Sequence, residues 1–128
     1  MEMVLLNPEI DDVRAEVIAA YLGITVSSFR VRLAEAWDQM RRYRQAIPAE
    51  CRDKFVLRAH NEAVYSSCFI IDYGTPSAKV LVDIKLYGIG RENSFAIELV
   101  NPGTMNSLYD RFAMSFQRIR DKSTIEPP

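Results

Sequence analysis

Apolar residues recur at helical spacing through the first third of the chain. Asn7-Pro8 is typical of a helix start, because Asn can cap free N–H groups and Pro fits the first turn. We therefore expect a helix over 8–22, with Asp11 and Asp12 as the place where it could break. A second apolar run meets no Gly or Pro before Pro48, which predicts one long helix ending near Ile47. Its seam would consist of Phe29, Leu33, Ala36, Met40, Tyr43 and Ile47.

The pattern changes from helical to alternating in the second half of the chain. After a third helix expected over 49–64, alternation predicts strands over 68–73, 79–87 and 94–100, with turns at 74–77 and 88–93. Short connections make these strands an antiparallel meander. One face is expected to carry Phe69, Ile71, Tyr73, Val80, Val82, Ile84, Leu86, Phe95, Ile97 and Leu99.

A last amphipathic helix is expected over 104–121, with Thr104 as its cap and the residues after it as a solvated tail. Its apolar stripe would cover the predicted sheet. The fold class is therefore α+β. We divide the chain into a helix-turn-helix region, 1–47, and an α+β module, 48–128, for dimerisation or partner binding.

Residues 18–33 carry the most specific motif, Ile18-Ala19-x-x-Leu22-Gly23-Ile24-Thr25-x-x-Ser28-Phe29-Arg30-x-Arg32-Leu33. Its small residue allows two helices to cross closely, and its apolar residues can fill the wedge between them. Gly23 stands where the chain must take a positive φ, and Thr25 can cap the following helix. This order predicts a helix-turn-helix that reads DNA.

The motif resembles the helix-turn-helix of the sigma-factor region-4 and LuxR-type regulator group, over these sixteen residues. By that resemblance Thr25 and Ser28 would touch phosphates, while Arg30 and Arg32 would contact bases and phosphates. A helix of this kind also faces outward at further positions. The DNA-binding residues we expect are Thr25, Val26, Ser27, Ser28, Arg30, Val31, Arg32 and Arg41.

Charge is distributed unevenly although the net charge of the 128 residues is only −1. Residues 1–25 hold one basic side chain against five acidic ones, whereas residues 26–60 hold eight against four. Positive charge therefore follows the expected reading helix. Cys51 and Cys68 have neither metal-ligand nor disulfide spacing, and no secretory or membrane signal is evident, so we expect a reduced, cytoplasmic protein.

The seam of the long helix has two interpretations. It packs against the protein's own body, or it forms the contact of a homodimer, which a reader of two half-sites one DNA turn apart would need. Arg41, Arg42 and Arg44 lie elsewhere on this helix, as a solvated face or as phosphate contacts.

A rival constellation consists of Asp72 and Asp83-x-Lys85 on neighbouring predicted strands, with Glu62 before them. This order resembles the PD-(D/E)xK nucleases, in which such carboxylates hold a divalent metal and the lysine stabilises developing charge. The solvated face of a half-covered sheet would show the same polar residues, and we favour that interpretation.

The sequence thus predicts a small sequence-specific DNA-binding transcriptional regulator acting as a homodimer, with no catalytic residues, metal or cofactor. The alternative is a protein-binding inhibitor, adaptor or chaperone module, favoured by the apolar Ile70 and Leu81 expected on the polar sheet face. The nuclease is the weaker third hypothesis.

Overall fold

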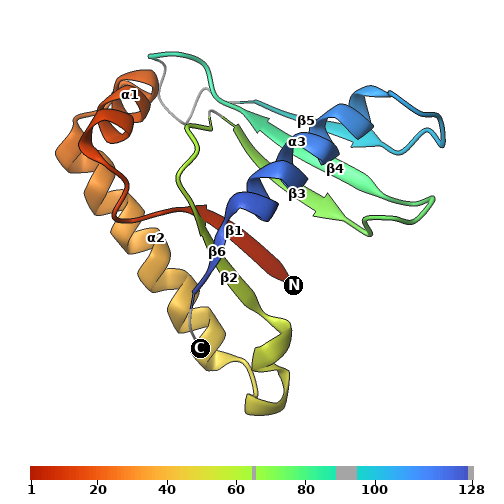
Figure 1. Cartoon of the computed structure of the whole chain (residues 1–128), viewed down its shortest axis with the longest axis horizontal. Coiled ribbons are helices and arrows are strands. Elements are labelled where there is room, and N and C mark those ends of the chain that lie inside the picture. The colour runs from red at the N-terminus through yellow and green to blue at the C-terminus, as the bar shows by residue number, and fades with distance from the viewer. Residues whose placement is uncertain (65, 89–94, 127–128) are drawn as a thin grey trace.

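The computed structural model describes residues 1–64, 66–88 and 95–126, and within them it confirms the α+β class (Figure 1). It has two three-stranded sheets, of which only the second was predicted. The elements follow in the order β1 (Glu2–Leu6), α1 (Asp12–Leu22), α2 (Val26–Ala46), the short 3-10 helix η1 (Ala49–Lys54), β2 (Val56–His60), β3 (Ser66–Ile71), β4 (Lys79–Ile84), β5 (Phe95–Val100), α3 (Leu108–Lys122) and β6 (Thr124–Ile125).

The first sheet has the order β1-β2-β6 and joins the two ends of the chain. β1 and β2 are parallel, with Met3 opposite Leu57, so their connection must cross over, and α1 and α2 form that crossover. β6 pairs antiparallel with β2. Strand β1 lies in the expected 1–47 region and β2 in the 48–128 region, so the two regions share this sheet.

Three local predictions for these segments are wrong. The third helix over 49–64 is replaced by η1 and β2, because the short apolar run around Leu57 forms a buried central strand. Residues 124–125 form a strand and not part of a solvated tail. The last two residues of the predicted tail, 127–128, lie outside the described residues. At the other end, residues 2–6 form an unexpected strand, and α1 begins at Asp12 rather than at Pro8.

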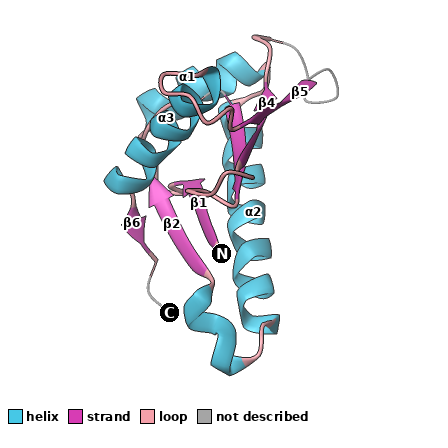
Figure 2. Cartoon of the chain, turned by 90° about the vertical axis from the view of Figure 1, so that its right-hand side faces the viewer, coloured by secondary structure: helices cyan, strands magenta, loops and turns pink. Residues whose placement is uncertain are grey.

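Helix α2 runs as far as predicted, and its apolar seam packs against the protein's own first sheet (Figure 2). Trp37 is 2 % exposed, and its indole Nε1–H donates to the Leu6 carbonyl at 2.7 Å. Around it lie Met3, Leu5, Leu33, Met40, Ile47, Phe55, Leu57 and Ala59. The seam is therefore largely occupied within one chain, although Tyr43 at its far end is exposed.

Strands β3, β4 and β5 form the expected antiparallel meander, with α3 packed on one face. Of the predicted connection over 88–93, residues 89–93 lie outside the described residues. Helix α3 begins three residues later than expected for a Thr104 cap, because Ser107 and Asp110 form a reciprocal capping box. Val80 and Val82 are fully buried beneath Tyr109 and Ala113 of α3.

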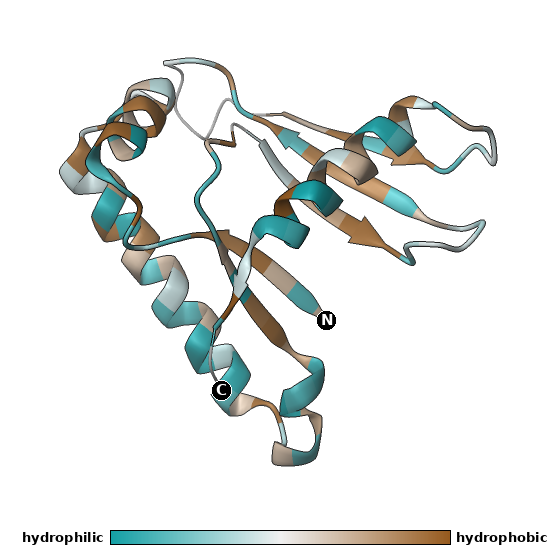
Figure 3. Ribbon diagram, in the orientation of Figure 1, coloured by the Kyte–Doolittle hydropathy of each residue, from teal (hydrophilic) through white to brown (hydrophobic). Residues whose placement is uncertain are grey.

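The face assignment of β3 is wrong by one residue. Cys68 and Ile70, not Phe69 and Ile71, are opposite Val82 and Val80 on the covered face. Phe69 is consequently 61 % exposed on the open face, and Ile70 is packed under α3 rather than exposed. Figure 3 shows how hydrophobic much of β3 is. Because both faces of this strand are apolar, alternation alone did not fix its orientation.

Tyr21, at the end of α1, joins the helices to the second sheet. Its hydroxyl donates to the Lys85 carbonyl at 2.8 Å, and its own carbonyl accepts from the Gly88 N–H at 2.8 Å. The ring also meets Tyr87 edge to face, with centroids 5.5 Å apart. These contacts fix the turn between α1 and α2 against the loop that follows β4.

Candidate nucleic-acid interface

Helices α1 and α2 meet at 96° across a three-residue turn, an arrangement that we call the helical corner. The Asp11 carboxylate caps α1 by accepting the Arg14 N–H at 3.0 Å. Gly23 ends α1 in the left-handed conformation, with φ +67°, as its sequence position predicts. Thr25 caps α2, also as predicted, by accepting the Ser28 N–H at 3.1 Å.

A small apolar core holds the corner together. Its buried residues are Ile10, Ala15, Ile18, Ala19 and Phe29, with Leu6, Leu22, Ile24, Val26 and Leu33 packed around them. Ala19, 1 % exposed, lets the two helices approach closely, as the motif requires. Val26 was expected to face outward and is instead half-buried against this core, since the first turn of α2 leans on α1.

The outer side of the first turns of α2 presents small polar groups and one cation. Ser27, Ser28, Val31 and Arg32 are exposed, as is the capping Thr25. The Thr25 hydroxyl donates to Ser28 Oγ at 3.0 Å, which leaves the Ser28 hydroxyl proton available for an external acceptor. Five of the eight expected DNA-binding positions, the capping Thr25 included, are therefore exposed at the N-terminal end of α2.

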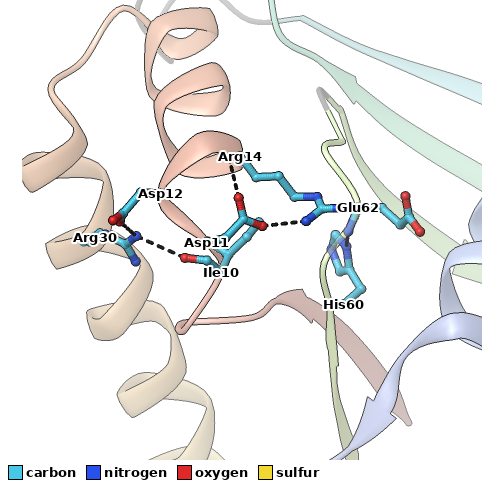
Figure 4. Close-up of polar contacts among 7 residues, drawn as sticks. All are labelled: Ile10, Asp11, Asp12, Arg14, Arg30, His60 and Glu62. Carbon is cyan, nitrogen blue, oxygen red and sulfur yellow. Dashed lines mark hydrogen bonds and ion pairs between the residues drawn. The ribbon is translucent and has the colours of Figure 1, made fainter.

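Arg30 is held inside the corner rather than presented outward (Figure 4). Its guanidinium donates to the Ile10 carbonyl at 3.0 Å and to Asp12 Oδ1 at 2.6 Å. Both partners lie where the chain enters α1, so Arg30 ties the start of α1 to the second turn of α2. To contact DNA, the Arg30 side chain would have to break its ion pair with Asp12.

Figure 4 also shows the Arg14 side chain extending from its pair with Asp11 toward Glu62, on the segment after β2. Arg14 and Glu62 are close in space but about fifty positions apart in the sequence. No sequence pattern could therefore have predicted that they meet. Glu62 accepts from Lys122 Nζ at 3.2 Å. Burial lowers the pKa of nearby His60, whose Nδ1 accepts the Glu62 N–H at 3.3 Å, so its neutral form is favoured.

Arg41, the last of the expected DNA contacts, lies four turns from the start of α2 and is engaged with the C-terminal segment. Its Nε donates to Glu126 at 2.7 Å, and its guanidinium carbon lies 5.4 Å from the centroid of the Trp37 ring. The helical corner does not bring Arg41 together with Ser27, Ser28 and Arg32.

The residues of the rival nuclease constellation do not meet. Asp83 lies beside Lys85, whose Nζ donates to it at 3.0 Å, and both belong to the open face of the second sheet. Asp72 has φ +52° in the turn after β3, whereas Asp83 is opposite Ser67 near the other end of that strand. Among the residues that the structure describes, no group of three or more His, Cys, Asp or Glu is placed to hold a metal ion.

Comparison with protein-family models, curated proteins and solved structures finds no match to this chain. Within the described part of the chain, no single helix has both the length and the apolar character to cross a membrane, and only the bent pair α1 and α2, taken together, meets that test by length and composition.

Proposed function

We propose that this protein is a DNA-binding transcriptional regulator that places the start of α2 in the major groove. The observation that carries the proposal is the helical corner itself. A 96° crossing, a three-residue turn containing Gly and a capped second helix are features of helix-turn-helix readers. An α-helix with its side chains is about 10–12 Å across, which fits a major groove about 12 Å wide.

Each contact residue has a role that its placement supports. Arg32 supplies a long cation for a base edge or a phosphate, while Ser27 and Ser28 reach phosphate oxygens beside the positive end of the helix dipole. Thr25 sets the geometry of that helix end. Arg30 acts through Asp12 by fixing the crossing of the two helices, and a direct DNA contact would require it to leave that pair.

The test begins with selection of bound fragments from random duplex DNA, followed by fluorescence anisotropy on the enriched site. Arg32→Gln is expected to weaken binding about 5- to 150-fold if Arg32 reads a base. Arg111→Gln is the matched control, because Arg111 is an exposed cation on α3, and it should leave affinity within about twofold. Absence of enrichment, or equal effects of the two variants, would overturn the proposal.

A second pair of variants separates the two roles of Arg30. Asp12→Asn removes the negative charge that pairs with the Arg30 guanidinium and leaves its hydrogen bond to the Ile10 carbonyl, while Glu16→Gln removes the same charge from an exposed position of α1. If Arg30 positions the helices, Asp12→Asn should lower DNA affinity relative to Glu16→Gln. A rise in affinity above that control would instead assign Arg30 a direct contact.

The homodimer needs a surface other than the seam of α2, which the chain's own sheet largely covers. We place the dimer contact on the open face of β3, β4 and β5, where Phe69, Ile71 and Val100 are 61, 44 and 53 % exposed. The charges of this face are paired within it, Lys79 with Glu98 and Asp83 with Lys85. Among the residues that the structure describes, a second copy of the face therefore meets no unmatched charge.

Analytical ultracentrifugation tests the dimer. Phe69→Ser should convert it to a monomer, whereas Tyr43→Ser, at an equally exposed aromatic on α2, should not. A wild-type chain that sediments as a monomer at tens of micromolar would overturn the homodimer. It would favour the second candidate function, a protein-binding module whose exposed apolar sheet face receives a different partner.

A further inference from the structure

A groove of about 540 Å³ lies beside the second half of α3, where this helix passes from the second sheet toward β6 and the first sheet. It is bounded by Tyr21 at the end of α1, by residues 62–64 after β2, and by the end of β4. A volume of this size lies in the range of small-molecule sites.

The lining of the groove is apolar where it continues the core beneath α3. Phe112 and Ile119 contribute from the helix, Ile84 from β4 and Val64 from the segment before β3. All four side chains are only half-buried, so apolar surface remains for a ligand to cover. Burial of such surface is the main favourable contribution to binding a small molecule with an apolar body.

The charged side chains around the groove favour an anion. Arg118 and Lys122 of α3 line the groove together with one carboxylate, Glu62, while the ammonium of the lining residue Lys85 is turned to Asp83 on the open sheet face. Lys85 and Lys122 already pair with Asp83 and Glu62, at 3.0 and 3.2 Å. No hydrogen bond or ion pair within the described residues engages the Arg118 guanidinium, which is exposed at the edge of the apolar lining.

We propose that this groove binds a small amphipathic carboxylate. The apolar body of the ligand would lie against Phe112, Ile119 and Ile84, and the carboxylate would receive the planar donor fork of Arg118. Ser115, one turn before Arg118 on the same side of α3, adds a hydroxyl at the entrance. This inference stands apart from DNA binding and needs no nucleic acid for its test.

Titration of ¹⁵N-labelled protein with octanoate, kept below its micelle range, tests the site. We expect octanoate to shift the amide resonances of residues around Ile84, Phe112 and Ile119 in a saturable way. 1-Octanol should bind at least about tenfold more weakly than octanoate, because it lacks the charge that Arg118 recognises. Absence of saturable shifts at these residues would overturn the proposal, as would equal binding of the neutral alcohol.

Three variants sharpen the assignment. Arg118→Gln should weaken octanoate binding about tenfold or more, while Arg111→Gln, which removes the same charge from another exposed position of α3, should leave it unchanged. Ser115→Phe should block the groove without removing a charge or a core residue. Wild-type affinity in Arg118→Gln, or in a folded Ser115→Phe variant, would contradict the proposal.

Discussion

Replacement of Gly23 by Ala would test the turn that sets the angle between α1 and α2. Gly23 has φ +67°, a conformation in which a Cβ atom destabilises the backbone by about 1–2 kcal/mol. Alanine also restricts the unfolded chain, which offsets about 0.4–1 kcal/mol of that effect. The backbone conformation alone should therefore destabilise the variant by about 1 kcal/mol.

A second effect arises from the neighbour of the turn. A Cβ on Gly23 would lie 3.2 Å from the Gly88 carbonyl oxygen and 3.3 Å from its carbonyl carbon, closer than ordinary van der Waals contact. The Gly88 loop would have to move by a few tenths of an ångström, although its N–H donates to Tyr21. Weakening that hydrogen bond adds about 0.5–1.5 kcal/mol.

Gly103→Ala is the matched control for this prediction. Gly103 has φ +69°, and no heavy atom lies within 4 Å of the position its Cβ would take. Urea unfolding followed by circular dichroism should thus show a greater loss in Gly23→Ala, by about 0.5–1.5 kcal/mol. Equal destabilisation of the two variants would refute the argument that the Gly88 loop packs on the turn.

Three further predictions concern groups outside the turn. Trp37→Phe should reduce the free energy of unfolding by about 1–3 kcal/mol, because it leaves the Leu6 carbonyl without its hydrogen-bond donor. A loss below about 0.5 kcal/mol in urea unfolding would argue against a stabilising role of this hydrogen bond. Burial lowers the pKa of His60 in the folded protein. The contribution of His60 to stability is therefore present above its unfolded pKa of about 6.5 and is lost as the pH falls through its folded pKa. His60→Gln should flatten the dependence of stability on pH in this window. Glu2 loses some of its contact with water, which raises its carboxyl pKa, but hydrogen bonds from Arg120 and Arg58 lower the pKa by more, so the net shift is downward. The stabilisation that this gives is present above pH about 4.5 and is lost on acidification. Glu2→Gln should therefore unfold less steeply with acid than the wild-type chain, and an unchanged acid transition would contradict the role of this pair of bonds.

Local chemistry made the end of α1 and the start of α2 predictable from the sequence. Gly23 and Thr25 act on their immediate neighbours through a positive φ and a side-chain cap, and both effects depend on two or three adjacent residues. The long α2 and the alternating strands of the meander follow from periodicities that sequence displays directly. The α+β class and the cover of the second sheet by α3 could be derived from these elements.

Only the tertiary structure decided what the elements pack against. The sequence of β2 predicted part of a helix. In the structure β2 pairs with β1 and β6, which come from opposite ends of the chain, and is the central strand of their sheet. Phe69 and Ile70 are both apolar, so which of them faces α3 depends on the register with β4. Arg30 fits the pattern of a DNA-contacting residue, yet its guanidinium bonds to Asp12, eighteen positions earlier. Such long-range pairings depend on which surfaces meet when the chain folds, and the spacing of residues along the chain carries no record of them.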